Sequence, residues 1–250
     1  MKLNNKNIIL TGASSGIGAE LCKLLCEGNK VFAVARNISK IPEHPNIISY
    51  SCDVSRQENL DSLFTEALKH FDSIDVFIAN AGYAYFGEYD KAEWEQMSGI
   101  FNTNVFSAIY SLQKMREISG DKAFNFAITA SGMSYLAMPG YALYSATKFA
   151  LKGFTDALRF ELKKGQVINM VYPIATLTSF FDVAGAKELP WPRQEASVVA
   201  KKIIKGISKN KKHIFPSALF ASMLFFNRFL PLFRIYKCLE NRKFKKSLGE

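Results

Sequence analysis

The chain has 250 residues, of which 48% are hydrophobic, so it can bury the core of one large α/β domain or two small ones. Its net charge of +10 comes from one end, because residues 201–250 hold 13 Lys/Arg against 2 Asp/Glu and the rest is nearly neutral. No internal repeat, low-complexity stretch or Pro/Ser-rich linker interrupts the sequence, which excludes a repeat array and favours one domain.

Short aliphatic stretches alternate with amphipathic stretches of helical length through the first 215 residues. The predicted strands are 7–11, 30–35, 46–50, 74–79, 123–128, 166–171 and 212–215. The clearest predicted helices are 56–70, 104–119, 142–164 and 195–209. This alternation predicts seven parallel strands joined by right-handed crossovers, in an α/β domain. Residues 175–194, with Pro190, Trp191 and Pro192, are predicted to form an irregular insertion before the last of these helices.

The first predicted strand runs into a turn of glycines and small residues, in NIILTGASSGIG at 7–18, and a helical pattern begins at Ile17. Gly12, Gly16 and Gly18 let the backbone turn sharply, let a diphosphate approach and let the helix pack on its strand. The free N–H groups and the dipole of that helix then face the phosphates. The alternative is a glycine-rich turn without a ligand, but its place after the first strand of a βαβ unit favours a dinucleotide site.

The end of the second predicted strand indicates which dinucleotide is preferred. An acidic residue there would bind the 2′-hydroxyl of an NAD ribose, whereas an arginine can pair with the 2′-phosphate of NADP. This sequence has Ala35 and Arg36 at that point, so NADP(H) is favoured over NAD(H). Ser14 and Ser15 in the glycine turn can add hydroxyl contacts to phosphate. The alternative for Arg36 is an exposed arginine that ends a strand.

Tyr144 and Lys148 are four residues apart in YALYSATKFAL, and helical geometry places such a pair on one face. A fixed cation beside a tyrosine stabilises the phenolate and lowers the pKa of the phenol. Such a tyrosine can exchange a proton with an alcohol or carbonyl oxygen near neutral pH. By itself the spacing is also common on solvated helix faces.

These features occur together with NAG at 80–82, Asn104 in NTNVFSA, and Ser131 at 13 residues before Tyr144. In this order, with TGASSGIG at 11–18 and YSATK at 144–148, they resemble the short-chain dehydrogenase/reductase family over roughly residues 6–215. The resemblance implies a single-domain Rossmann fold, with a doubly wound seven-stranded parallel sheet and helices on both faces, in residues 1–215. Residues 216–250 are expected to be an extension, either part of this domain or a membrane or oligomer contact.

The resemblance also implies a catalytic set, namely Asn104, Ser131, Tyr144 and Lys148. Tyr144 would be the acid in reduction and the base in oxidation, while a hydride passes between the nicotinamide and a carbonyl or secondary alcohol. Lys148 would lower the tyrosine pKa and hold the ribose hydroxyls. Ser131 would hydrogen-bond the substrate oxygen, with Ser134 as a competitor only if the loop register differs. Asn104 would place a water that relays protons by way of Lys148.

The cofactor contacts that the resemblance implies begin at the glycine turn and end at the loop after the sixth strand. Besides Arg36, Tyr144 and Lys148 they are Gly12, Ser14, Ser15, Gly16, Ile17, Gly18, Asp53, Val54, Asn80, Ala81, Gly82, Pro173 and Thr178. One position departs from the family pattern, because its Pro-Gly after the sixth strand is here Pro173-Ile174. Isoleucine cannot adopt glycine-only backbone angles cheaply, so this loop is expected to take an altered course.

The cysteines and histidines give no sign of a metal site or a disulfide framework. Cys22, Cys26, Cys52 and Cys238 form no C-x-x-C pair, and His44, His70 and His213 are scattered, so no metal is expected. Free thiols suit the reducing cytoplasm. The start MKLNNKN lacks a hydrophobic signal segment, so we expect a cytoplasmic protein that is not exported.

The basic C-terminal region is also apolar, with FASMLFF at 220–226, FLPLF at 229–233 and NRKFKK at 241–246. Asn227, Arg228, Pro231 and Arg234 interrupt the apolar stretch, which argues against a membrane-spanning helix. Two explanations are open. The stretch packs on the core or forms a dimer interface, or residues 217–246 lie peripherally on a membrane with lysines on anionic headgroups. Nucleic-acid binding by the basic tail is the least favoured reading.

The sequence therefore predicts an NADP(H)-dependent carbonyl reductase or alcohol dehydrogenase that acts on a fairly apolar small molecule. A homo-oligomer, either a dimer or a tetramer, is the expected assembly. The alternative is a nucleotide-binding regulatory or membrane-associated protein of similar fold with little turnover, and Ile174 is its only support in the sequence.

Overall fold

The computed structural model describes residues 3–186 and 190–249. Its centre is a parallel sheet of seven strands in the order β3-β2-β1-β4-β5-β6-β9. The strands are β1 Asn7–Thr11, β2 Lys30–Ala35, β3 Ile47–Ser51, β4 Val76–Ala79, β5 Phe124–Thr129, β6 Gln166–Val171 and β9 His213–Ile214. All seven predicted strands are present, and no end is shifted by more than two residues. The strand order reverses between β1 and β4, and this reversal opens a crevice at the carboxyl ends of the strands.

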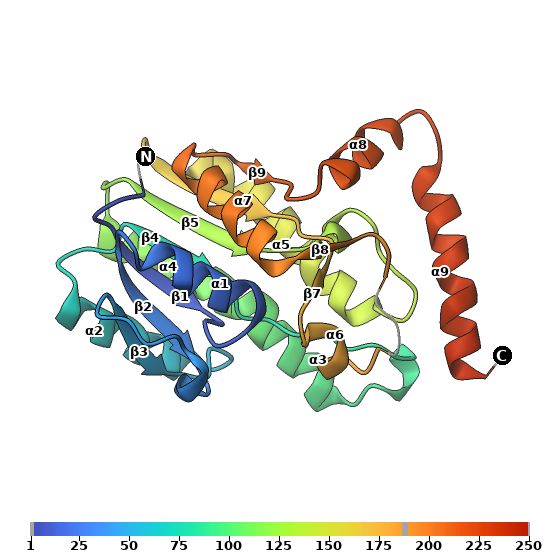
Figure 1. Cartoon of the computed structure of the whole chain (residues 1–250), viewed down its shortest axis with the longest axis horizontal. Helices are drawn as coiled ribbons and strands as arrows, with labels where there is room; N and C mark the ends of the chain where they lie inside the picture. Colours follow the sequence, from blue (N-terminus) through green and yellow to red (C-terminus); the bar gives the residue numbers. More distant parts are fainter. Residues whose placement is uncertain (1–2, 187–189, 250) are drawn as a thin grey trace.

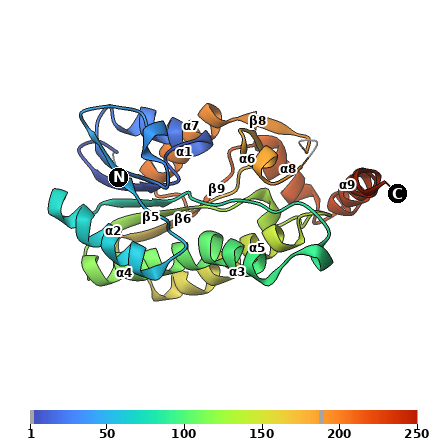
Figure 2. The ribbon, with the colours of Figure 1, turned by 90° about the horizontal axis from the view of Figure 1, so that it is seen from below.

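Helices cover both faces of the sheet, which confirms the doubly wound fold (Figure 2). One face carries α1 Gly16–Leu25 and α7 Ala196–Ser208. The other carries α2 Gln57–His70, α3 Trp94–Phe101, α4 Ser107–Ser119 and α5 Ala142–Leu158. Because successive side chains of a strand point to opposite faces, Ile8 and Leu10 pack with the first pair of helices, while Ile9 packs with the second group.

The helices form where apolar residues recur at helical spacing. In α2 the buried residues are Leu60, Leu63, Phe64 and Ala67, which make one continuous stripe against the sheet. The predicted helix 142–164 ends earlier, at Leu158, and a 3₁₀ turn at Arg159–Glu161 follows. The predicted helix 104–119 is α4, and a π-helical turn at Asn102–Phe106 joins it to α3. The first helix begins at Gly16, one residue before the predicted start.

The segment 175–194 is more regular than predicted. It contains β7 Ala175–Leu177, α6 Phe180–Val183 and the start of β8 Arg193–Glu195, and β7 pairs with β8 in a parallel two-stranded sheet. Residues 187–189 of this predicted insertion lie outside the described residues. Strands of three residues are too short to show an alternating pattern in the sequence, and their pairing depends on a partner strand further along the chain.

Two helices follow the last strand, α8 Ala218–Phe226 and α9 Leu232–Leu248, at one end of the molecule (Figure 1). Besides the apolar clusters on the two faces of the sheet, the molecule has one at this end. In it Phe220 of α8 and Phe233 of α9 are buried with Tyr141, Tyr144 and Phe181. The C-terminal region therefore packs on the core through part of its surface. Among the described residues, no helix is both long enough and apolar enough to span a bilayer.

Candidate functional site

A cavity of about 370 Å³ opens at the carboxyl ends of the strands, where the strand order reverses. The predicted site residues that line it are Gly12, Ser14, Ser15, Gly16, Ile17, Arg36, Asp53, Val54, Asn80, Ala81, Gly82, Ser131, Tyr144, Lys148, Pro173 and Thr178. Gly18 and Asn104, which the structure also describes, do not line it. The fold thus gathers most of the predicted residues around one space.

The glycine turn after β1 needs its glycines for backbone shape and for close approach. Gly12 and Gly16 have φ angles of +69° and +52°, in the left-handed region that favours glycine. A Cβ on Gly12 would lie 2.9 Å from the Cα of Ala81, and one on Gly16 would lie 3.0 Å from the Cγ2 of Thr178. A Cβ on Gly18 would lie 1.9 Å from the carbonyl oxygen of Gly12. Gly18 therefore closes the helix onto the turn, which explains why it does not face the cavity.

Side-chain hydrogen bonds fasten the ends of three strands beneath the cavity. The Thr11 Oγ1 at the end of β1 accepts from the backbone N–H groups of Asn80 and Ala81, at 3.1 Å each. The Asn80 Nδ2 donates to the Gly12 carbonyl (3.3 Å), and the Thr129 Oγ1 at the end of β5 donates to the Asn80 Oδ1 (3.1 Å). Thr11 and Thr129 were not predicted as site residues. The only signal in the sequence is that each threonine is the last residue of an apolar strand.

Tyr144, Lys148 and Ser131 meet in the deeper part of the cavity. Tyr144 and Lys148 lie on the buried side of α5, with the Lys148 Nζ 5.3 Å from the centre of the Tyr144 ring. The same Nζ donates to the Thr129 carbonyl at 3.0 Å. The Ser131 hydroxyl contacts the Tyr144 phenol and also accepts from the Met133 N–H at 3.1 Å. A phenol, an ammonium and a hydroxyl are therefore held together by the helix and the loop after β5.

The expected lowering of the Tyr144 pKa by Lys148 is not what the structure shows. Burial raises the pKa of Tyr144, and the hydrogen bond from Ser131 opposes this only in part. Burial also lowers the pKa of Lys148, to about 8. The reason is that both groups are buried and burial disfavours the charged form of each. At neutral pH Tyr144 carries its proton.

The lowered pKa of Lys148 predicts a pH-dependent stability. Between pH 8 and pH 10.5, its ordinary value, the unfolded chain binds a proton that the folded chain has released, so unfolding becomes harder as the pH rises. We expect the wild type to gain on the order of 3 kcal/mol of unfolding free energy over Lys148→Met across this window. Urea denaturation of both proteins at several pH values measures it. A difference in unfolding free energy that stays constant across these pH values would contradict the prediction.

Asn104 lies in the π-helical turn and is bonded to the loop after β4. Its Nδ2 donates to the Tyr83 carbonyl (2.9 Å) and to the Thr147 Oγ1 (3.2 Å), and its Oδ1 accepts from the Tyr83 N–H (3.0 Å). A Cβ on Gly82 would lie 3.0 Å from the Asn104 Oδ1 and 3.8 Å from the Lys148 Nζ. Asn104 therefore ties the floor of the cavity to α5. The predicted water relay stays a prediction.

Arg36 and Asp53 lie at the other end of the cavity, after β2 and β3. Burial works to raise the pKa of Asp53, but hydrogen bonds from Ser55 and the charges of Arg36 and Arg56 outweigh it and lower that pKa. Burial raises the pKa of Tyr83, which faces the opposing charges of Arg36 and Asp53. This end of the cavity thus combines a guanidinium, a carboxylate and an aromatic ring.

Ile174 stands where the family pattern has glycine, and its backbone does not need a glycine-only conformation. Among the described residues, the non-glycine positions with positive φ are Asn5 and Asn210, so Ile174 has an ordinary backbone conformation. Its carbonyl accepts from the Thr176 Oγ1 at 2.9 Å, and Pro173 accepts from the Gly132 N–H at 2.7 Å. The loop then enters β7 and brings Thr178 against Gly16.

The remaining wall of the cavity is mostly apolar and includes the C-terminal helices. Its side chains are Met133, Leu136, Met138, Phe180, Phe181, Val183, Trp191, Phe220, Met223 and Tyr236. The Tyr236 hydroxyl of α9 donates to the Trp191 carbonyl at 2.5 Å and so joins α9 to the segment before β8. Met223 and Tyr236 were not predicted as site residues, because nothing in a C-terminal apolar stretch indicates which side chains turn inward.

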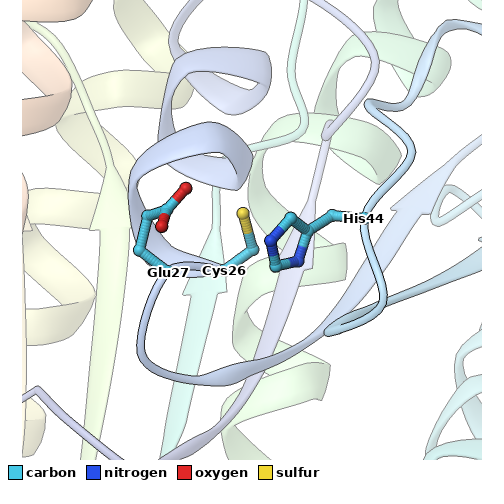
Figure 3. A group of neighbouring side chains, drawn as sticks. All are labelled: Cys26, Glu27 and His44. Carbon is cyan, nitrogen blue, oxygen red and sulfur yellow. The ribbon is translucent and has the colours of Figure 1, made fainter.

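A second group of chemically reactive side chains, Cys26, Glu27 and His44, lies away from the cavity (Figure 3). Their potential ligand atoms are within 4.8 Å of one another, at the amino ends of the strands, between the end of α1 and the start of β3. Burial, and then the charge of Glu27, raises the pKa of the Cys26 thiol, which donates to the Lys23 carbonyl. The His44 Nδ1 accepts from the Asn46 N–H.

Comparison with known proteins matches residues 6–188 to the family described as short chain dehydrogenase. An uncharacterized oxidoreductase of Schizosaccharomyces pombe is 32% identical over 168 residues, which cover 65% of this chain and 57% of that protein. The 11-beta-hydroxysteroid dehydrogenase 1A of Arabidopsis thaliana is 26% identical over 242 residues, which cover 85% of this chain and 68% of that protein.

Two solved structures show the same fold. A short chain dehydrogenase/reductase from Burkholderia phymatum in complex with NAD superposes with a TM-score of 0.82 at 18% identity, covering 91% of this chain and 94% of that one. A short chain dehydrogenase from Burkholderia cenocepacia in complex with NADP superposes with a TM-score of 0.80 at 19% identity, covering 93% and 96%.

Proposed function

Since this chain belongs to the short-chain dehydrogenase family, we propose that it is an NADP(H)-dependent oxidoreductase that interconverts a carbonyl and a secondary alcohol on an apolar molecule. The observation that carries the proposal is the meeting of Tyr144, Lys148 and Ser131 in a cavity that opens onto the glycine turn. A proton donor, a cation and a hydroxyl at the edge of a dinucleotide site are the groups that this reaction needs.

The residues at the glycine turn fit a dinucleotide. Gly12 and Gly16 line the cavity and take the positive φ angles of a tight turn, and the first turn of α1 contains no acidic side chain. Ser15 precedes α1 but makes no side-chain hydrogen bond to it, so the first N–H groups of the helix stay available to phosphate oxygens. These groups and the Ser14 hydroxyl would hold the diphosphate, and Asp53, Val54 and Asn80–Gly82 would line the adenosine side.

When bound, the nicotinamide supplies or accepts the hydride. The chain's own part is to position the substrate oxygen and to move its proton. Tyr144 would give a proton to that oxygen in reduction and take one in oxidation, while Ser131 would donate a hydrogen bond to it. Lys148 would bind the ribose hydroxyls and, by way of Asn104 and a water, return the proton to Tyr144. Thr178, which rests on Gly16, would contact the nicotinamide side of the cofactor.

Cofactor choice is the first specific consequence of this proposal. We expect Arg36→Ala to weaken NADPH binding by about 1.5–3 kcal/mol, or roughly tenfold to hundredfold, because Arg36 lines the cavity where the 2′-phosphate would lie. Binding of NADH should change little. Titration of protein fluorescence with each nucleotide measures both constants. The matched control is Arg56→Ala, which removes an equal charge near Asp53 but does not line the cavity. Equal affinity of the wild type for NADH and NADPH would contradict the prediction.

The substrate is proposed to have a large apolar body, because side chains such as Leu136, Phe181 and Met223 form most of the wall beyond Tyr144. The Arabidopsis relative, named as a hydroxysteroid dehydrogenase, is consistent with a secondary alcohol on such a body. The alternative, a nucleotide-binding protein with little turnover, rests on Ile174 alone, and the φ of that residue is not positive.

The test is a screen of apolar ketones with NADPH and of the matching alcohols with NADP⁺, followed through the absorbance of the reduced nicotinamide. We expect activity that rises with the apolar surface of the substrate. Tyr144→Phe gives the background for each compound. Tight binding of nucleotide without turnover of any compound in the screen would favour a regulatory nucleotide-binding protein instead.

A further inference from the structure

The C-terminal helices and the turn between them have an inner and an outer set of large apolar side chains. The inner rings, Phe220 and Phe233, are buried and stacked with centroids 6.2 Å apart, and Phe220 lines the cavity. The outer set consists of Phe225, Phe226, Phe229 and Leu230, which we call the aromatic tip. These side chains are between 51% and 74% exposed, although isolated apolar side chains, not groups of four, are what a protein surface ordinarily carries.

The aromatic tip is held in place by hydrogen bonds within the turn between α8 and α9. The Asn227 Oδ1 accepts from the Phe233 N–H at 2.8 Å, and the N–H groups of Phe229 and Leu230 both donate to the Phe226 carbonyl at 3.0 Å. The Phe225 ring is 5.4 Å from that of Phe226 and 6.0 Å from that of Phe229. The rings therefore contact one another and face outward from an ordered turn.

Positive charge lies within the aromatic tip and along the helix that follows it (Figure 1). Arg228 lies within it, Arg234 and Lys237 follow at the start of α9, and Arg242, Lys243, Lys245 and Lys246 follow further on. In the described part of this region, 217–249, the one acidic residue is Glu240, and it pairs with Lys243 at 2.7 Å. Exposed aromatic side chains among arginines and lysines match the boundary of a bilayer with anionic headgroups. A second copy of the chain on the same face would instead bring like charges together.

We propose that the aromatic tip inserts into the interface of an anionic membrane and sets the cavity beside the lipid. Met223 and Tyr236 line the cavity and belong to the same two helices, so a substrate dissolved in the lipid would reach Tyr144 by passing them. The choice of substrate rests on the proposed function, whereas the membrane contact does not. Binding should weaken with salt, because it depends in part on attraction between charges.

The experiment is flotation of the full chain with vesicles of phosphatidylcholine alone, or of equal parts phosphatidylcholine and phosphatidylglycerol. We expect partitioning onto the anionic vesicles, and at least about a tenfold loss in the double variant Phe225→Ser/Phe229→Ser. Arg228→Gln/Arg234→Gln should lose at least about tenfold on anionic vesicles. The matched control is Phe160→Ser, which removes a 94% exposed ring after α5, outside the C-terminal helices.

Partitioning that is indifferent to lipid charge, or that Phe160→Ser weakens as much as the tip variant, would overturn the proposal. Light scattering without vesicles measures the oligomeric state and so tests whether the aromatic tip binds a second copy of the chain. If the wild type is oligomeric, the tip variant is monomeric and both partition equally, then the tip is a subunit interface and the proposal fails. Nucleotide binding measured without vesicles keeps the two proposals apart, because a chain that floats with anionic lipid but binds no NADPH would contradict only the enzymatic function.

Discussion

Tyr144→Phe is expected to lower turnover by about 10²–10⁴ while nucleotide binding survives. The substitution removes the hydroxyl that contacts Ser131, and it leaves a ring of almost equal volume in the same buried site beside the Lys148 Nζ. Because burial raises the pKa of Tyr144, the wild-type phenol is protonated at neutral pH and ready to act as the acid in reduction. The variant keeps Lys148, which is the residue proposed to hold the ribose.

Steady-state rates and NADPH titrations of both proteins measure this. The matched control is Tyr141→Phe, because Tyr141 is buried, its ring is 6.4 Å from that of Tyr144, and its hydroxyl has no hydrogen-bond partner among the described residues. Removing that hydroxyl should leave turnover within about threefold of the wild type. A Tyr144→Phe enzyme that keeps more than about a tenth of the wild-type rate would exclude Tyr144 as the proton donor.

Gly18→Ala is expected to destabilise the fold by about 3 kcal/mol or more and to abolish nucleotide binding. Its Cβ would lie 1.9 Å from the Gly12 carbonyl oxygen. This oxygen belongs to the backbone, which cannot move away as the end of a flexible side chain can. Either α1 moves away from the turn or the turn opens, and each change displaces the first N–H groups of the helix. In an unobstructed helix the same substitution is favourable, by about 1 kcal/mol.

Gly153→Ala supplies the matched control, because Gly153 lies within α5 and a Cβ there would meet nothing within 4 Å. Urea denaturation should show a lower unfolding free energy than the wild type for Gly18→Ala and a higher one for Gly153→Ala. Of the two variants, NADPH titration should show binding only for Gly153→Ala. If Gly18→Ala is as stable as the wild type and binds NADPH, the close packing of helix and turn is not what holds the site.

The sequence indicated the site best where the required chemistry is local. Gly12 and Gly16 occupy the positive φ angles that their spacing suggested, and Tyr144 and Lys148 share the buried side of one helix, as their separation requires. It also indicated Arg36 at the end of β2, where it lines the cavity. These are properties of a few neighbouring residues, because backbone sterics and helical periodicity operate over short distances along the chain.

Other features depend on residues that are far apart in the sequence. Thr11 and Asn80 are 69 residues apart, and their hydrogen bond exists only because β1 and β4 are neighbours in the sheet. The direction in which the Tyr144 pKa shifts is also set by the tertiary structure. The helix alone suggested that Lys148 would lower it, but the side chains that close over both groups remove water from them, and this effect is larger.

The sequence by itself determined the alternation of strands and helices, the glycine turn and the tyrosine-lysine pair. It also showed that apolar and basic residues coincide near the C-terminus. Only the tertiary structure decided that Phe220 and Met223 face the cavity while Phe225 and Phe229 face outward, since α8 is apolar all round and has no period to orient it. The orientation of such a helix is set by the surface on which it packs, and that surface includes the loop after β5, α5 and α6, which are distant in the chain.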